Sequence, residues 1–291
     1  MVCSSLLGKG LCNLVLVLFS LRGERGMIGA IIGDIVGSRF EFNNYRHKDF
    51  ELFTEDCGFT DDSIMSLAVA KALLSAKSDY SDLSECAVHY MQAIGRPYPN
   101  SGYGGRFYHW MYSDNPQPYN SFGNGSAMRV SACGYVGNSI EEVIALSDAV
   151  SKVSHNHIEG LKGAQATAVA VYLARTGSSL EQIKDYIVKH YYAIDFTIDE
   201  IRDTYQFNET CQDTVPQALE AFFESENFED ALRIAISVGG DSDTLAAITC
   251  AVAEAYYGVP NSIRTQALSY LDEQMLSLLQ EFESHYPGKQ A

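Results

Sequence analysis

Hydrophobic residues recur at three- and four-residue steps along most of this chain, which is the spacing of one face of an α-helix. The run from Ser63 to Leu74 is a clear example, and Thr60, Asp61 and Asp62 before it are residue types that favour helix starts. The apolar and polar alternation that is typical of strands is almost absent. The pattern predicts helices over residues 27–36, 63–74, 83–94, 105–112, 126–136, 140–153, 158–174, 180–192, 215–225, 228–236, 245–257 and 262–284.

Glycines interrupt the first predicted helix at regular intervals. Gly29, Gly33 and Gly37 are four residues apart, so they lie on one helix face. This spacing predicts that the helix packs closely against another element.

Residues 96–125 break the helical pattern with prolines, glycines and aromatic residues. Loops of this length within a compact domain are usually functional. The rings could stack a purine base, or they could simply pack in the interior. They belong to Tyr98, Tyr103, Phe107, Tyr108, Trp110, Tyr112, Tyr119 and Phe122.

Composition limits the classes of protein to consider. The chain has 291 residues, 46% of them hydrophobic, and no linker divides it, so we expect one domain. Its net charge of −17 argues against a grip on nucleic acid or on an anionic membrane, because both need a basic surface. The seven cysteines are scattered and include no Cys-x-x-Cys. They favour reduced thiols in a cytoplasm over a disulfide framework or a thiolate zinc site.

Residues 1–26 differ in character from the rest. The apolar run 11–21 is too short to span a bilayer. It loosely resembles a signal peptide, but no small-x-small cleavage site follows. We favour the alternative that 1–26 is an extension with a mis-assigned start and that the domain covers 27–291, because Met27 opens the domain-like pattern directly.

Two short motifs carry candidate chemistry. Thr60-Asp61-Asp62 and Asp241-Ser242-Asp243-Thr244 each place two carboxylates and a threonine at a predicted helix start. Oxygen ligands of this kind select magnesium, calcium or manganese. Glu41 brings the set to five carboxylates, which could not all stay ionised side by side without cations. Two divalent ions supply +4, so we expect two metals. Ordinary helix capping is the alternative for each motif.

Two further motifs give weaker signals. Gly123-Asn124-Gly125-Ser126 opens a predicted helix, where free amides could cradle an anion, although a plain capped turn has the same pattern. In Ser154-His155-Asn156-His157 we expect His157 to form a capping turn. We expect His155 to lie near the ligand as a hydrogen-bond or stacking partner.

Taken in order, these motifs resemble the ADP-ribosylglycohydrolase family, which includes the dinitrogenase reductase-activating glycohydrolase and the ADP-ribosylarginine and ADP-ribosylserine hydrolases. The resemblance runs from about Met27 to Pro260. Ser63 stands where many members have threonine, and residues 1–26 have no counterpart. The matching motifs are Gly29-x-x-x-Gly33-Asp34-x-x-Gly37 with Glu41, Phe59-Thr60-Asp61-Asp62, Gly123-Asn124-Gly125-Ser126-Ala127-Met128-Arg129, Ser154-His155 and Gly239-Gly240-Asp241-Ser242-Asp243-Thr244.

The resemblance implies an all-α fold, a compact single-domain orthogonal helical bundle with a dinuclear metal cleft. It implies two magnesium ions, with manganese as an alternative, held by Thr60, Asp61, Asp62, Asp241, Asp243 and Thr244. It also implies that Asn124, Gly125 and Ser126 hold the ADP-ribose phosphates and that His155 lines the ligand. Glu41 matches a glutamate at the metal centre. Our candidates for the catalytic acid/base are Glu41 and Asp62.

The expected function is therefore magnesium-dependent hydrolysis of the glycosidic bond between ADP-ribose and a protein side chain or other acceptor. One alternative is a non-catalytic binder of ADP-ribose or nucleotide. Others are hydrolysis of another ADP-ribosyl or nucleoside-type linkage and a purely structural role. We expect a cytoplasmic monomer or weak oligomer whose partner is the ADP-ribosylated substrate.

Overall fold

A computed structural model describes residues 26–287. Within this range it contains helices and no strand, and one isolated antiparallel bridge joins Gly123 to Thr210. The all-α prediction is therefore confirmed. The elements are α2 (Ile28–Gly37), η1 (Ser38–Phe40), α3 (Asp61–Ser75), α4 (Leu83–Gly95), α5 (Gly105–Tyr112), η2 (Asn124–Ser126), α6 (Ser131–Val136), α7 (Ile140–Ser151), α8 (Ile158–Arg175), α9 (Leu180–His190), α10 (Ile198–Ile201), α11 (Cys211–Phe223), α12 (Phe228–Val238), α13 (Ser242–Tyr257), α14 (Asn261–Leu268) and α15 (Glu273–His285).

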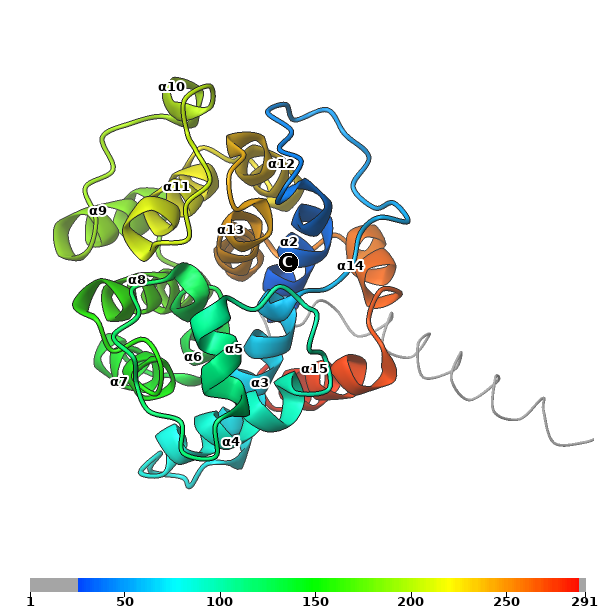
Figure 1. Ribbon diagram of the computed structural model, residues 1–291. Helices are drawn as coiled ribbons and strands as arrows, with labels where there is room; N and C mark the ends of the chain where they lie inside the picture. The colour runs from blue at the N-terminus through cyan, green and yellow to red at the C-terminus, as the bar shows by residue number, and fades with distance from the viewer. Residues whose placement is uncertain (1–25, 288–291) are drawn as a thin grey trace, which may run out of the picture.

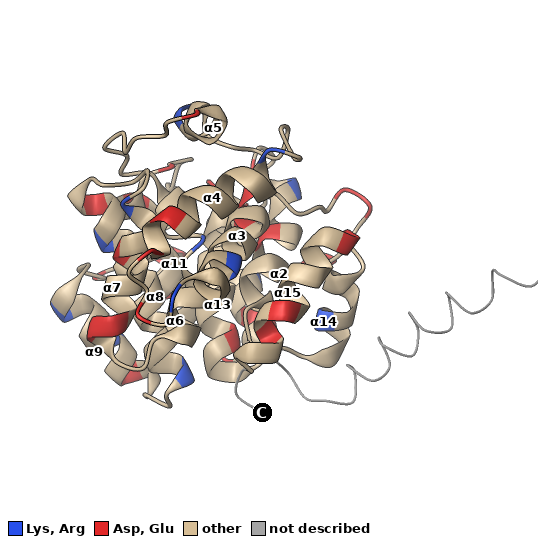
Figure 2. Ribbon diagram, turned by 90° about the horizontal axis from the view of Figure 1, so that it is seen from below, with Lys and Arg blue, Asp and Glu red and all other residues tan. Residues whose placement is uncertain are grey.

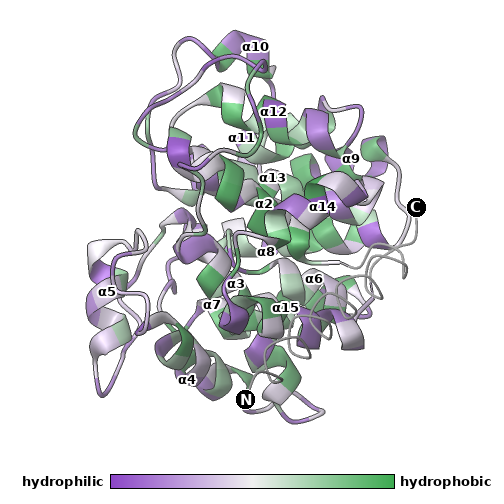
Figure 3. Ribbon diagram, turned by 90° about the vertical axis from the view of Figure 1, so that its right-hand side faces the viewer, coloured by the Kyte–Doolittle hydropathy of each residue, from purple (hydrophilic) through white to green (hydrophobic). Residues whose placement is uncertain are grey.

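Helices α2 and α13 form the centre of the molecule (Figure 1). Every residue of α2 is buried, and so is every residue of α13 from Ser242 to Ala255. A helix that is apolar on nearly every side is buried, and both helices fit this pattern apart from a few polar residues such as Asp34 and Asp243. In Figure 3 the hydrophobic ribbon of these two helices lies inside, and hydrophilic residues mark the outer loops.

The glycine face of α2 meets α13 directly. A Cβ atom at Gly29 would lie 2.3 Å from the Cys250 carbonyl oxygen, and one at Gly33 would lie 2.2 Å from the Ala246 carbonyl oxygen. One at Gly37 would lie 2.5 Å from Cα of Asp243. The two helices thus run antiparallel at a separation that only glycine permits. The prediction of a close-packed glycine face is confirmed, and the partner is the helix that begins with the second acidic motif.

Two predicted helices differ clearly from the structure, and one observed helix was not predicted. The helix expected over 126–136 begins only at Ser131, because residues 124–126 form a 3₁₀ turn whose Asn124 carbonyl accepts from both Ala127 and Met128. The helix expected over 262–284 is two helices, and the second one starts at the Asp272 side chain, which accepts from the Met275 amide at 2.9 Å. The short helix α10, which starts at a Thr197–Glu200 capping box, was not predicted.

Buried apolar side chains of the described residues form one hydrophobic cluster. Charged residues are scattered over the outer helices (Figure 2). None of the helices within 26–287 combines the length and apolarity that crossing a bilayer requires. The predicted extension 1–26 lies outside the described residues, except for Gly26. The five described cysteines, Cys57, Cys86, Cys133, Cys211 and Cys250, are free thiols.

Candidate metal centre and cleft

A cleft brings together nearly all the residues that the sequence singled out. Of the eleven predicted site residues, only Thr60 and Ser126 do not line it. Its walls come from the loop after α2, the starts of α3 and α13, residues 102–129, His155 and the loop before α11. The lining residues are Glu41, Asp61, Asp62, Gly102, Gly104, Gly105, Arg106, Phe107, Tyr119, Ser121, Gly123, Asn124, Gly125, Met128, Arg129, His155, Glu209, Asp241, Asp243 and Thr244.

At the start of α3, the residue that caps the helix is different from the acidic residues that could bind a metal ion. Thr60 is the N-cap residue, and its Oγ1 accepts from the Asp62 amide at 3.4 Å. The Asp61 amide donates to the Ser101 carbonyl at 2.7 Å. Because threonine performs the capping, the carboxylates of Asp61 and Asp62 are left to face the cleft.

The start of α13 lies opposite. Gly239 and Gly240 adopt φ values of 75° and 73°, which disfavour other residues, and the turn that they form delivers Asp241. The Asp241 side chain makes no capping bond. Thr244 Oγ1 donates to Asp62 Oδ2 at 3.3 Å. This contact joins the two motifs across 182 positions of sequence.

Asp34 completes the centre from α2, although the sequence analysis gave it no role. Its carboxylate accepts from the Thr60 amide at 2.8 Å, Thr60 Oγ1 at 2.6 Å, the Ser63 amide at 3.0 Å and Ser63 Oγ. A carboxylate within an otherwise apolar helix was the available signal. Asp34 therefore holds the start of α3, and it explains why a hydroxyl at Ser63 suffices there.

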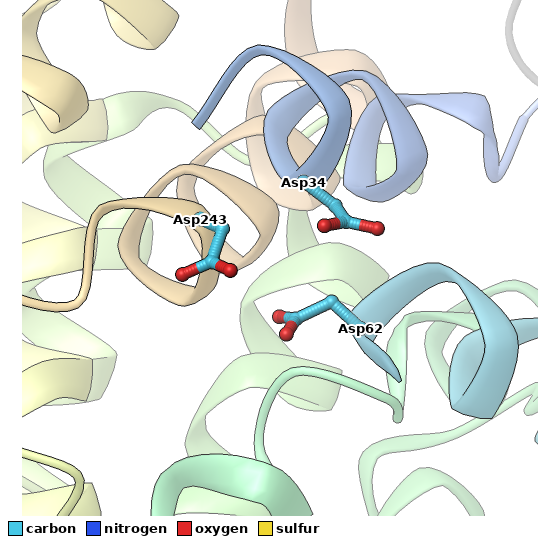
Figure 4. A group of neighbouring side chains, drawn as sticks. All are labelled: Asp34, Asp62 and Asp243. Carbon is cyan, nitrogen blue, oxygen red and sulfur yellow. The ribbon is translucent and has the colours of Figure 1, made fainter. Parts of the chain in front are cut away.

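Two groups of acidic residues could each hold a metal ion. Asp34, Asp62 and Asp243 point toward one another from α2, α3 and α13 (Figure 4). Glu41, Asp241 and Asp243 form the second group. Within each group, the candidate ligand oxygens lie within 4.8 Å of one another. Asp243 belongs to both.

Burial controls the ionisation of these groups. Desolvation and then neighbouring acids, Asp34 first for both Asp61 and Asp62, raise the pKa of each well above its ordinary value. The pKa of Asp243 is raised well above its ordinary value by burial and then by Asp241. The pKa of Glu41 is raised to about 7, again chiefly by burial and then by Asp241. A nearby cation would stabilise the ionised form of these buried carboxylates and so lower their pKa.

Fewer backbone amides of the glycine turn at 123–126 are available to bind an anion than the sequence suggests. The amides of Gly123, Asn124 and Ser126 already donate to Ser121 Oγ, the Glu209 carbonyl and the Gly123 carbonyl. The Ser126 hydroxyl donates to the Gly160 carbonyl at 2.8 Å, so it supports the turn from beneath. The Asn124 carboxamide donates to Asp241 Oδ2 at 2.6 Å and to Thr214 Oγ1 at 3.1 Å.

His155 is buried beside this turn. Its Nδ1 lies 2.8 Å from Ser154 Oγ, which also accepts from Arg129 Nη2 at 2.9 Å. Burial and the positive charge of Arg129 lower the pKa of the imidazole well below its ordinary value. His155 is therefore neutral near pH 7. His157 caps α8 by accepting from the Glu159 amide, so the predicted capping turn is confirmed.

Two lining residues, Arg106 and Glu209, went unnoticed in the sequence because no local pattern marks them, and Arg129 was named there only as the last residue of a motif. Arg106, Arg129 and Glu209 face the cleft from separate elements. Of the eight aromatic residues in 98–122, only Phe107 and Tyr119 line it. Packing explains others: the Trp110 indole donates to the Val153 carbonyl from a buried position, and the Tyr98 hydroxyl donates to Asp272.

Known proteins share this architecture. A family model described as ADP-ribosylglycohydrolase matches residues 21–289. ADP-ribosylarginine hydrolase Tri1 of Pseudomonas putida (strain GB-1) is 26% identical over 269 residues, which cover 82% of this chain and 71% of that protein. ADP-ribosylhydrolase ARH3 of Homo sapiens is 25% identical over 338 residues, which cover 89% and 92%.

A solved structure of an ADP-ribosylglycohydrolase-related protein complex has the same fold. It superposes with a TM-score of 0.61 at 20% identity and covers 88% of this chain and 95% of that chain. The family match over nearly the whole chain, the relatives in sequence and the shared fold agree with one another. The chain belongs to the ADP-ribosylglycohydrolase family and is a hydrolase of ADP-ribosyl glycosidic bonds.

Proposed function

We propose that this protein is a magnesium-dependent hydrolase of the glycosidic bond that links ADP-ribose to a protein side chain or other acceptor, and that it releases free ADP-ribose. One observation carries the proposal. Two acidic groups that share Asp243 place all their members except the buried Asp34 in a cleft whose other walls hold Arg106, Arg129 and His155. Such a cleft offers a place for cations beside groups that suit a phosphorylated sugar.

The acidic groups fit divalent cations. Oδ1 of Asp62 is buried and has no hydrogen-bond partner among residues 26–287, although a buried carboxylate oxygen normally has one. The donor set consists of oxygen atoms only, which suits magnesium or manganese. Asp34, Asp62 and Asp243 would hold one ion, and Asp241 and Asp243 would hold the other, with the Glu41 carboxylate beside it. Asp61, Thr60 and Thr244 are further candidate ligands.

Bound cations supply positive charge that lowers the pKa of a nearby water. The protein groups would supply the proton transfer and the positioning. Glu41 is half-buried at the cleft, and burial and neighbouring acids raise its pKa to about 7 in the metal-free protein. A nearby cation would favour its ionised form, which is the form that accepts a proton from water. Asp62 is the second candidate base, but its Oδ2 already accepts from Thr244. We therefore favour Glu41 as the base and Asp62 as a ligand.

Hydrolysis requires water to add to the anomeric carbon as the bond to the acceptor breaks. The proton of that water would pass to Glu41, and the acceptor would take up a proton from Glu41 or from solvent as it leaves, so that the carboxylate is restored. The sugar carries positive charge in the transition state. The carboxylates around it would stabilise that charge. Gly125 and the two arginines would bind the phosphates at a distance from the reacting carbon and so position the sugar.

A direct test measures release of free ADP-ribose from a panel of substrates modified at arginine, at serine or at a nucleic-acid end, with and without magnesium. Asp241→Ala and Asp243→Ala should each abolish release, whereas Glu85→Ala at an exposed position of α4 should not change it. Full activity of either cleft variant would refute the metal assignment. Tight binding of ADP-ribose by calorimetry without turnover on any substrate would instead favour a binding protein.

A further inference from the structure

Two consecutive glycines, Gly239 and Gly240, form the turn that delivers Asp241 to the candidate metal centre. Both adopt positive φ values, and glycine has more conformational freedom than any other residue. Such a turn does not by itself fix the direction of the side chain that follows it. A metal ligand binds more tightly when neighbouring groups hold it in position. The contacts between this turn and the rest of the chain therefore decide how well Asp241 is placed.

The Asn44 carboxamide pairs with both backbone groups of Gly240. Its Oδ1 accepts from the Gly240 amide at 2.8 Å, and its Nδ2 donates to the Gly240 carbonyl at 2.9 Å. One side chain thereby satisfies the donor and the acceptor of a residue whose φ is 73°. The contact spans 196 positions of sequence.

The same Nδ2 also reaches the backbone at Glu41. It lies 2.9 Å from the Phe40 carbonyl oxygen and 3.0 Å from the Glu41 carbonyl oxygen. An amide nitrogen carries two hydrogens, so three carbonyl oxygens share them. One planar group thus joins Glu41 to the turn before Asp241. The carboxylates of Glu41 and Asp241 belong to one acidic group, and a tether opposes the repulsion between their like charges.

Arg46 holds the residues just before this turn. Its guanidinium donates to the Val238 carbonyl at 2.8 Å and to the Tyr205 carbonyl at 2.5 Å. It packs so closely against Gly239 that a Cβ atom there would lie 3.1 Å from Arg46 Cζ. The short segment 44–46 therefore contacts three consecutive residues, 238–240.

We infer that Asn44 is a positioning residue of the candidate metal centre, which holds Glu41 and the Asp241 turn at a fixed separation so that both carboxylates face the site of the cation. The inference rests on the proposed function, which places a cation there. Arg46 is the second tether. Asn44 is not one of the described residues that line the cleft, so it acts through Glu41 and Asp241 and does not touch the substrate.

The test is a calorimetric titration of the substrate-free protein with magnesium. Asn44→Ala should raise the dissociation constant by at least about tenfold, the usual effect of removing a group that holds a metal ligand. Asn44→Asp keeps the acceptor for the Gly240 amide but replaces the donor with an oxygen that would face three carbonyls. It should therefore also bind magnesium at least about tenfold more weakly than its matched control.

The matched controls are Asn43→Ala and Asn43→Asp at the adjacent exposed residue. They repeat the changes in size and in charge without the contacts to Gly240. Asn43→Ala should match the wild-type protein, and Asn43→Asp measures the effect of the added charge alone. Arg46→Lys keeps a positive charge but loses the planar fork, and it should weaken magnesium binding as well.

A second measurement separates positioning from a general structural role. In Asn44→Ala, kcat for ADP-ribose release at saturating magnesium should fall less than the magnesium affinity does, because the bound cation then attracts the carboxylates into place. Equal magnesium affinities in the Asn44 variants and their Asn43 controls would overturn the inference. So would a loss of stability toward urea in Asn44→Ala without any loss of affinity.

The failure of the inference and that of the proposed function can be distinguished. If the wild-type protein binds magnesium but releases no ADP-ribose from the substrate panel, the proposed function fails, and a weaker affinity in Asn44→Ala still supports the inference. A wild-type protein that binds no magnesium would overturn both.

Discussion

The Asn124 side chain donates a 2.6 Å hydrogen bond to Oδ2 of Asp241. This bond ties the glycine turn to the candidate metal centre across 117 positions of sequence. The turn that would hold the phosphates and the carboxylate that would hold a cation are therefore mechanically linked. Asn124 therefore lines the cleft and also holds the side chain of Asp241, a candidate metal ligand, in place.

Removing this bond should weaken metal binding. Hydrogen bonds to charged groups contribute about 1.5–3 kcal/mol, so Asn124→Ala should raise the magnesium concentration for half-maximal activity by at least about tenfold. Thr214→Val is the matched control, because it removes the other partner of Asn124 and leaves the Asp241 contact. An unchanged magnesium requirement in Asn124→Ala would show that the bond does not position Asp241.

Asp34 should matter for stability. Asp34→Ala would leave the two amides and two hydroxyls of Thr60 and Ser63 without their acceptor. Because each unsatisfied buried group costs about 1–3 kcal/mol, urea denaturation should show a loss of at least about 2 kcal/mol. Ser63→Ala removes a single hydroxyl and should cost less. Equal stability of Asp34→Ala and wild type would contradict the anchoring role.

The stability of the metal-free protein should fall between about pH 4.5 and pH 7. The pKa of Glu41 is about 7 in the folded protein against an ordinary 4.5, so the folded state retains a proton that the unfolded state releases. Stability from this group is complete below its unfolded pKa and is lost as the pH rises through the folded value. Asp61, Asp62 and Asp243 shift in the same direction.

Thermal unfolding in EDTA and in magnesium, at pH 5 and pH 8, measures this effect. Magnesium should raise the Tm more at pH 8, where the carboxylates must ionise. Glu41→Gln should raise the Tm of the metal-free protein at pH 8 and have little effect at pH 5. An equal magnesium-induced shift at both pH values would argue that the carboxylates are not linked to the cation.

The glycine face of α2 should tolerate no side chain. Gly33→Ala places a Cβ 2.2 Å from the Ala246 carbonyl oxygen, so α2 and α13 must separate. Overpacking of this kind costs about 1–3 kcal/mol. Gly58→Ala is the control, because its Cβ would meet nothing within 4 Å. Denaturation midpoints should fall for Gly33→Ala and not for Gly58→Ala.

Much of the fold followed from local patterns. Apolar spacing located most helices, because a helix buries one face and its period is short. Thr60 was recognisable as part of a helix start, and the glycines of α2 as a packing face, for the same reason. The acidic pairs at 61–62 and 241–243 were found through charge counting, since five clustered carboxylates require cations whatever the fold.

Only the tertiary structure decided which partners these residues meet. It showed that Asp34 anchors α3, that the Asn124 side chain turns toward Asp241, that the Ser126 hydroxyl points beneath its turn and that Glu209 lines the cleft. It also divided the predicted helix 262–284 at Asp272. Each of these depends on contacts between segments that are distant in sequence, and a local pattern contains no information about such contacts. The sequence by itself determined the helices and the residue types of the site, and the packing of α2 against α13 determined how those residues meet.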